Sequence, residues 1–202
     1  MRLRAEPQGT PAGLPAQVIV GSTVLIVPGL RDDMPGHWQQ LLAARLERVV
    51  SVPPMGRTDL GCERRVAAVE AAAQSVDGPL LIVAHSAGCI TVAHWARRTR
   101  RVVHGALLAA PPDFETPMPE GYPTPAQLAA SGWLPLPRAR LPFGRSVVAA
   151  SRNDPLARFS RSAQLAEAWG AELVDLGEAG HLNPASGHGE WPQALELIAT
   201  FQ

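Results

Sequence analysis

The chain has 202 residues, of which 46% are hydrophobic and 18% are charged, and its 18 Lys and Arg residues balance 18 Asp and Glu residues. These values are typical of a globular enzyme, and we expect one domain over residues 1–202. A net formal charge of zero argues against nucleic acid or an anionic membrane surface as the main partner, because both need a basic patch. No apolar run approaches the ~18 residues that a membrane-spanning helix needs.

The N-terminus and the cysteine content bear on location. Residues 1–17 are polar and rich in Pro and Gly, which predicts a loose tail without the apolar centre of a signal peptide. The two Cys residues, Cys62 and Cys89, are too few for a disulfide framework, so we expect a cytoplasmic protein. Cys89 is interpreted as a small core residue. No Cys and His residues stand at the spacing of metal ligands, and we expect neither a metal nor a cofactor.

Apolar runs and helical patterns alternate along the chain. We predict strands over residues 23–28, 48–52, 79–84, 105–110, 146–150 and 172–176, and helices over residues 36–47, 62–74, 88–98, 160–169 and 190–201. The strand runs are continuously apolar, as expected when both faces of a sheet are covered. Together the elements predict an α/β fold with a doubly wound, mostly parallel sheet of about six strands and helices on both faces. Ligands of such sheets bind beyond the carboxyl ends of the strands.

Residues 110–142 interrupt this pattern. The segment is dense in Pro, which excludes a long helix or a central strand. It follows a predicted strand end and carries Tyr122 and Trp133. It therefore forms either a wall or partial lid of the substrate pocket, with Trp133 as a substrate-binding residue, or an ordered surface loop without substrate contact.

The stretch from Pro79 to Cys89 carries the strongest functional signal. An apolar run of strand length ends at Ser86, and a helical pattern follows. Ala84 and Gly88 flank the serine at the positions where strand and helix backbones come close. A strand, a sharp turn with Ser at its tip and a helix form the nucleophile elbow of an α/β-hydrolase, with Ala84 in place of the usual first Gly.

A serine nucleophile needs a base and a group that orients the base. His181 follows the last predicted strand and Asp154 follows the strand before it, so both lie at carboxyl ends. Their order after Ser86 is that of an α/β-hydrolase. His188 is a weaker rival for the base, and Asp113 for the carboxylate.

The oxyanion of a tetrahedral intermediate needs hydrogen-bond donors. We expect one donor from the backbone N–H of Ala87, at the start of the helix that follows the elbow. The second is expected from Leu30, in the loop after the first strand. Gly29 lets this loop turn toward the site and is expected to contact substrate.

From about Thr23 to Phe201 the chain resembles the small α/β-hydrolases of the retinoblastoma-binding-protein-nine and YdeN type. The matching segments are Val27-Pro28-Gly29, Gly36-His37-Trp38-Gln39, Ala84-His85-Ser86-Ala87-Gly88-Cys89, Ala93-His94-Trp95, Ala110-Pro111-Pro112-Asp113, Ala150-Ser151-Arg152-Asn153-Asp154-Pro155, Ala168-Trp169-Gly170-Ala171, Gly180-His181-Leu182-Asn183 and Gly187-His188-Gly189-Glu190-Trp191. The resemblance implies a compact hydrolase without a large helical cap and a triad of Ser86, Asp154 and His181. It implies no particular substrate. His37 is expected to brace the first helix at the rim of the substrate pocket.

These patterns indicate a serine hydrolase that cleaves a small carboxylic ester, thioester or amide through an acyl-enzyme. The predicted partner is therefore a small-molecule ester, with neither nucleic acid nor membrane, although a protein partner fits the sequence too. The alternative is a protein-binding module on a hydrolase scaffold with little turnover. Haloalkane dehalogenase chemistry is disfavoured because the nucleophile position holds Ser86 rather than Asp.

Overall fold

The computed structural model describes residues 21–30 and 34–201, so the tail predicted over residues 1–17 lies outside the described residues. One sheet contains six strands, all pairing in parallel, in the order β2-β1-β3-β4-β5-β6. The strands are β1 (Thr23–Val27), β2 (Val49–Ser51), β3 (Leu80–His85), β4 (Val103–Ala109), β5 (Arg145–Ala150) and β6 (Glu172–Asp175). The predicted fold class is confirmed.

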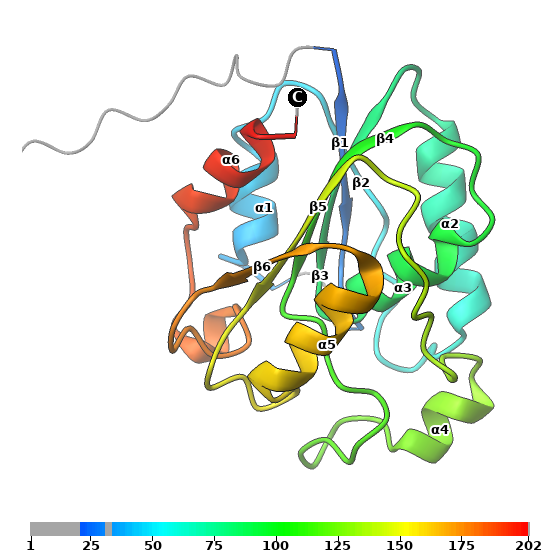
Figure 1. Cartoon of the computed structure of the whole chain (residues 1–202), viewed down its shortest axis with the longest axis vertical. Coiled ribbons are helices and arrows are strands. Elements are labelled where there is room, and N and C mark those ends of the chain that lie inside the picture. The colour runs from blue at the N-terminus through cyan, green and yellow to red at the C-terminus, as the bar shows by residue number, and fades with distance from the viewer. Residues whose placement is uncertain (1–20, 31–33, 202) are drawn as a thin grey trace, which may run out of the picture.

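Helices cover both faces of the sheet. They are α1 (Trp38–Ala43), α2 (Cys62–Gln74), α3 (Ala87–Ala96), α4 (Pro125–Ala130), α5 (Phe159–Trp169) and α6 (Pro192–Ala199). Figure 1 shows α1 and α6 on one face and α2, α3 and α5 on the other, and α4 beyond the end of the sheet toward which the strands run. Each face has its own buried hydrophobic cluster.

The continuous apolar runs are explained by this double cover. Leu25, Ile82, Leu108 and Val148 have no exposed surface, and their strand neighbours, which point to the opposite face, are at most 4% exposed. Such central strands gain no advantage from alternating polar residues, because no face meets water.

The strand order reverses between β1 and β3. From β1 the chain crosses to β2 on one side and then returns to place β3 on the other side. A crevice forms outside the carboxyl ends at such a switch point. The loop after β1 and the turn after β3 therefore meet at the position where this fold class binds ligands.

Helix α4 was not predicted. It occupies only residues Pro125–Ala130 within the Pro-rich segment, so it does not conflict with the exclusion of a long helix. Thr124 caps it, with the side chains of Thr124 and Gln127 each bonding the other residue's backbone N–H, and Pro125 stands in the first turn. Thr-Pro-x-Gln is a readable helix-start signal.

Candidate active site

Ser86 sits at a strained turn between β3 and α3. Its backbone has φ 55° and ψ −130°, a conformation that non-glycine residues rarely adopt. The Ser86 N–H donates to the Ala109 carbonyl at 2.9 Å, which ties the turn to the end of β4. The surrounding sheet and helix thus hold the hydroxyl above the strand ends.

The two small residues that flank Ser86 play different roles. A Cβ at Gly88 would lie 2.5 Å from the Val27 carbonyl oxygen and 2.7 Å from that of Pro28. Side chains do not tolerate such distances to backbone, so Gly88 is required by the approach of α3 to the end of β1. Ala84 fits its methyl group fully buried within β3, which explains why the usual first Gly is dispensable here.

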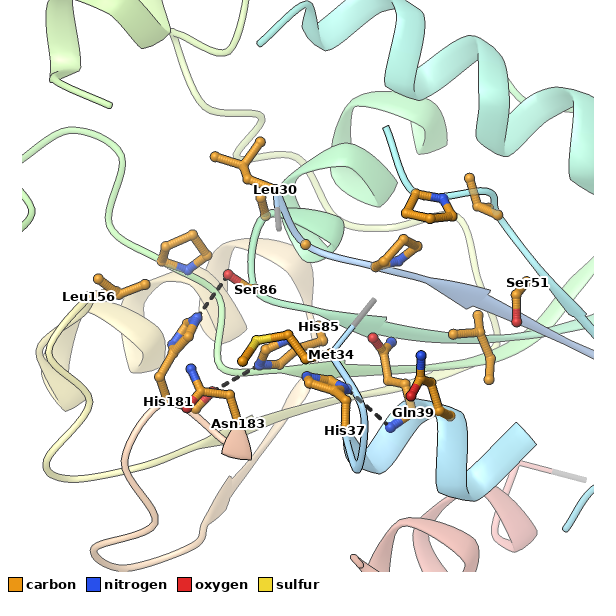
Figure 2. A pocket seen from close by; sticks show the side chains of 18 of the residues that line it. Leu30, Met34, His37, Gln39, Ser51, His85, Ser86, Leu156, His181 and Asn183 are labelled. Atoms are coloured by element: carbon orange, nitrogen blue, oxygen red, sulfur yellow. Dashed lines mark hydrogen bonds between the residues drawn. The ribbon is translucent and has the colours of Figure 1, made fainter. Parts of the chain in front are cut away.

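His181 and Asp154 converge on Ser86 as the sequence predicts. His181 Nε2 lies 2.8 Å from Ser86 Oγ, and His181 Nδ1 lies 2.9 and 3.0 Å from the two carboxylate oxygens of Asp154. Figure 2 shows the imidazole directed at the serine oxygen. Because a carboxylate only accepts, Nδ1 donates and Nε2 is left to accept the serine proton. The His181 and Asp154 side chains are only 6% and 4% exposed, which strengthens their interaction.

The side chains of Ser151 and Asn153 join the loop that carries Asp154 to the loop that carries His181, by a clasp of hydrogen bonds. The Asn153 amide oxygen accepts from the Gly180 N–H at 2.7 Å, and Ser151 Oγ accepts from the Ala179 N–H at 3.0 Å. Ser151 Oγ itself donates to Asn153 at 2.8 Å. Sequence reasoning did not single out this clasp, although Ser151 and Asn153 belong to the segment that carries Asp154.

The rival candidates lie elsewhere. The Asp113 carboxylate accepts from the Thr116 hydroxyl at 3.1 Å and from the Arg161 guanidinium at 3.3 Å. His188 packs its ring against Trp191, and partial burial lowers its pKa. Among the described residues, no hydrogen bond, ion pair or ring contact joins either of them to Ser86 or His181.

His85, the residue before Ser86, contacts the candidate base, although the sequence analysis assigns it no role. Its Nε2–H donates to the backbone carbonyl of His181 at 2.9 Å, because a carbonyl oxygen only accepts. Its ring lies 4.8 Å from the His37 ring and 5.0 Å from the His181 ring. Full burial, and then the neighbouring histidines, lower its pKa well below the usual value. A neutral imidazole thus supports the backbone of the candidate base.

The residues His37, Trp38 and Gln39 tie α1 to the site. His37 caps α1 by accepting the Gln39 N–H through Nδ1 at 3.2 Å, as its predicted bracing role requires. Trp38 is buried edge-on against His85. The Gln39 amide nitrogen donates to the carbonyls of Val27 and Val83 at 3.2 and 3.1 Å, which joins the ends of β1 and β3.

A cavity of about 430 Å³ opens over Ser86, within the usual range for small-ligand pockets of roughly 300–1,000 Å³. Gly29, Leu30, His37, Ser86, Ala87 and His181 line it together with Ile26, Met34, Gln40, Ala43, Ser51, Pro112, Phe114, Met118, Tyr122, Leu156 and others. Figure 2 shows Ser86 and His181 at one end and Ser51 at the other.

The expected oxyanion donors border the nucleophile. Ala87 is the first residue of α3, where backbone N–H groups lack partners within the helix. A Cβ at Gly29 would lie 3.0 Å from Ser86 Cβ, so the backbone before Leu30 passes very close to the serine. Only a residue without a side chain permits this approach without displacing neighbours.

Trp133 lies away from the cavity, contrary to its predicted place in the substrate pocket. It has no exposed surface, packs edge-on against Phe114 and donates its indole N–H to the Leu60 carbonyl at 2.7 Å. The Pro-rich segment does border the cavity, but through Phe114, Met118 and Tyr122. Trp133 supports this wall from behind, because a large ring gains most by complete burial.

Ion pairs anchor the same segment to α5. Arg161, on α5, binds the carboxylates of Asp113 and Glu115, and Arg138 binds Glu115 at 2.7 Å. The Asp113 N–H also donates to the Leu156 carbonyl at 2.9 Å. The wall of the cavity is therefore tied to the loop that follows Asp154.

The two cysteines are buried thiols. Burial raises the pKa of Cys62 to about 11 and that of Cys89 well above its usual range. Cys89 Sγ donates to the Ala109 carbonyl at 3.3 Å. Both cysteines are therefore protonated core groups at neutral pH.

The described residues also bear on metal binding and on membrane insertion. Within residues 21–30 and 34–201, His, Cys, Asp and Glu side chains nowhere gather in threes in a way that could hold a metal ion. None of the helices described for this chain has the length and apolarity that crossing a membrane requires.

The chain is similar to known proteins in sequence and in structure. Residues 24–200 match the model of the family described as serine hydrolase. A putative YdeN-like hydrolase from Pectobacterium atrosepticum is 28% identical, with a TM-score of 0.77 over 92% of this chain and 93% of that chain. The ydeN gene product from B. subtilis is 18% identical, with a TM-score of 0.69 over 89% of this chain and 98% of that chain.

More distant structures share the fold. Alpha/beta hydrolase domain-containing protein 10 from mouse is 15% identical, with a TM-score of 0.65 over 90% of this chain and 89% of that chain. A comparison with curated protein sequences finds no match. The family model spans nearly the whole chain, from β1 to the end of α6, and the chain belongs to the serine hydrolase family of α/β-hydrolases.

Proposed function

We propose that this enzyme hydrolyses a small carboxylic ester, or a related thioester or amide, through an acyl-enzyme on Ser86, and that the chain forms one catalytic domain. The observation that best supports this proposal is a continuous chain of hydrogen bonds. It runs from Ser86 Oγ to His181 Nε2 at 2.8 Å and from His181 Nδ1 to Asp154 at 2.9 Å. Nucleophile, base and orienting carboxylate thus stand within hydrogen-bond reach of one another.

In the first half-reaction, Ser86 Oγ attacks the substrate carbonyl and passes its proton to His181 Nε2. The carbonyl oxygen becomes an oxyanion, which the N–H groups of Ala87 and Leu30 stabilise in this proposal. The intermediate then collapses, the bond to the leaving oxygen breaks, and the imidazolium returns the proton to that oxygen. Asp154 stabilises the imidazolium while it exists.

In the second half-reaction, water takes the place of Ser86. It attacks the acyl-enzyme carbonyl and gives a proton to His181, and a second tetrahedral intermediate forms. Collapse releases the carboxylic acid and returns the proton to Ser86 Oγ. Every proton lost from a nucleophile thus reaches a leaving oxygen, and no cofactor takes part in this sequence.

A fluorophosphonate probe tests the nucleophile. It reacts with activated serines by losing fluoride and forming a phosphoryl–oxygen bond. We expect the wild type to be labelled and the Ser86→Ala variant to be unlabelled, and p-nitrophenyl esters to be hydrolysed only by the wild type. Equal labelling of both proteins, or an inert wild type, would overturn the proposal and favour a binding module on the hydrolase scaffold.

A further inference from the structure

Residues from both faces of the sheet line the cavity, and we divide its lining into two parts. The α1 lobe, which we define by Ile26, Met34, Gln40, Ala43 and Ser51, extends from Ser86 past α1 to the end of β2. The β4 wall, which we define by Pro112, Phe114, Met118 and Tyr122, follows β4. Ile26 and Ala43 belong with the hydrophobic cluster under α1 and α6, whereas Phe114 and Met118 belong with the cluster under α2, α3 and α5. A substrate bound at Ser86 can therefore extend in two directions.

The candidate base approaches from the same face as the α1 lobe. Leu182, next to His181, lies in the cluster that also holds Trp38 of α1. His85 bonds the His181 backbone, and its ring packs at a tilt against the ring of His37, which itself lines the cavity. Figure 2 shows the His85 side chain between those of His181 and His37, with Ser51 farther along on the His37 side.

The proton path decides which part of the substrate enters which lobe. The leaving oxygen must come within hydrogen-bond reach of His181 Nε2, because that nitrogen protonates it. The group attached to this oxygen is then directed along the His85 and His37 side of the cavity. The acyl group, attached on the other side of the carbonyl carbon, is directed toward the β4 wall.

We propose that the α1 lobe binds the leaving group of the substrate, and that this group is an extended alcohol that carries its own hydrogen-bonding groups, while the β4 wall receives a compact apolar acyl group. The inference rests on the proposed ester hydrolysis and adds to it the division of the cavity between the two products.

The polarity of the two parts supports this assignment. Within the described part of the chain, no hydrogen bond engages the side chain of Gln40 or Ser51, so both are available to a ligand. The amide nitrogen of neighbouring Gln39 is already used by two backbone carbonyls. The β4 wall offers mainly apolar side chains.

Two ester panels test the division. In the first panel the leaving group is always p-nitrophenol and the acid lengthens from acetate to decanoate. In the second the acid is always butyrate and the alcohol is methanol, 1-hexanol or hexane-1,6-diol bearing a single ester. We expect the wild type to favour short acids in the first panel and the diol ester in the second, measured as kcat/KM by absorbance and by pH-stat titration.

Two substitutions in the α1 lobe give the direct test. Ala43→Leu should lower the kcat/KM ratio of the diol ester to the methyl ester by about tenfold, the effect of one misfitted methylene or more. Gln40→Met should lower the ratio of the diol ester to the hexyl ester by roughly fivefold, the worth of one hydrogen bond. Ala44→Leu is the matched control, since Ala44 is exposed and outside the cavity lining.

Met118→Phe, in the β4 wall, should change the results of the first panel and shift the preferred acid toward shorter chains. If Ala43→Leu shifts the acid profile instead, the assignment of the lobes is overturned. If it alters neither panel while the fluorophosphonate still labels Ser86, the lobe is unused, and the inference fails although the proposed function stands. If the wild type neither hydrolyses esters nor is labelled, the proposed function fails and this inference falls with it.

Discussion

The side chain of His85 holds the backbone of His181, through a 2.9 Å hydrogen bond from Nε2 to the carbonyl oxygen. The next residue, Leu182, has φ 51°, a backbone conformation that costs energy for a branched side chain. The bond thus supports the candidate base at the start of a strained turn. His85 is a positioning residue in this arrangement, because it acts through His181.

Replacement of His85 by Leu removes this support. We expect kcat for p-nitrophenyl butyrate to fall by about 10–100-fold with little change in KM, since small displacements of a catalytic group have effects of this size. His85→Gln keeps an N–H donor and should recover part of the loss. A purely structural role would lower the melting temperature of both variants without separating their kcat values, and that outcome would contradict the assignment.

The same residue predicts how stability depends on pH. Burial keeps the pKa of His85 well below 6.5 in the fold, whereas the unfolded chain binds a proton near its ordinary pKa of about 6.5. The unfolded state then holds more protons, so the free energy of unfolding falls as pH drops below about 6.5. Each such group contributes a slope of up to about 1.4 kcal/mol per pH unit.

Urea unfolding between pH 7.5 and 5 measures this slope. His94 and His188, whose pKa values are also lowered by burial, contribute to it in the wild type. We therefore expect the slope of His85→Leu to be smaller than that of the wild type but not zero. An identical slope would show that His85 does not resist protonation.

Of the two residues that flank the nucleophile, Gly88 should be far more sensitive than Ala84 to a change of one methyl group. Gly88→Ala places a Cβ 2.5 Å from the Val27 carbonyl oxygen, so α3 or β1 must move. We expect loss of fluorophosphonate labelling and a lower melting temperature. Ala84→Gly removes a methyl group from a position that accommodates it, and should retain labelling with a loss of stability of about 1 kcal/mol.

The two carboxylates that competed for the role of orienting residue can be separated by experiment. Asp154→Asn removes the acceptor that fixes the tautomer of His181, and we expect kcat to fall by about 10⁴-fold, as in other serine hydrolases. Asp113→Asn weakens the contact with Arg161, and should lower the free energy of unfolding by about 1.5–3 kcal/mol. A larger loss of kcat in Asp113→Asn than in Asp154→Asn would reverse the assignment.

The fold and the candidate triad could be predicted because both produce local patterns in the sequence. Buried parallel strands are continuous apolar runs, and each candidate triad residue lies shortly after the end of one of them. The elbow also has its own short sequence pattern. Gly88 belongs to this pattern because the backbone of β1 comes too close to α3 for a side chain at this position. The cytoplasmic location and the loose tail over residues 1–17 stay predictions.

Other features depend on contacts between distant segments and produce no local pattern in the sequence. Trp133 stands in a Pro-rich segment without periodicity, so nothing nearby shows whether its ring faces substrate or Leu60. Neighbouring side chains on a tight turn diverge, so His85 cannot act as the base for Ser86. The same divergence directs its ring to the His181 backbone, a contact between residues 96 positions apart.

The ion pairs between Arg161 and the carboxylates of Asp113 and Glu115 have a consequence for evolution and for engineering. They fasten the stretch that borders the cavity onto α5, which begins shortly after Asp154. The anchoring charges are separate from Met118, which lines the cavity, so this side chain can be exchanged while the segment stays in place. New specificities can therefore be sought by exchanging the facing residues alone, with the anchoring charges left untouched.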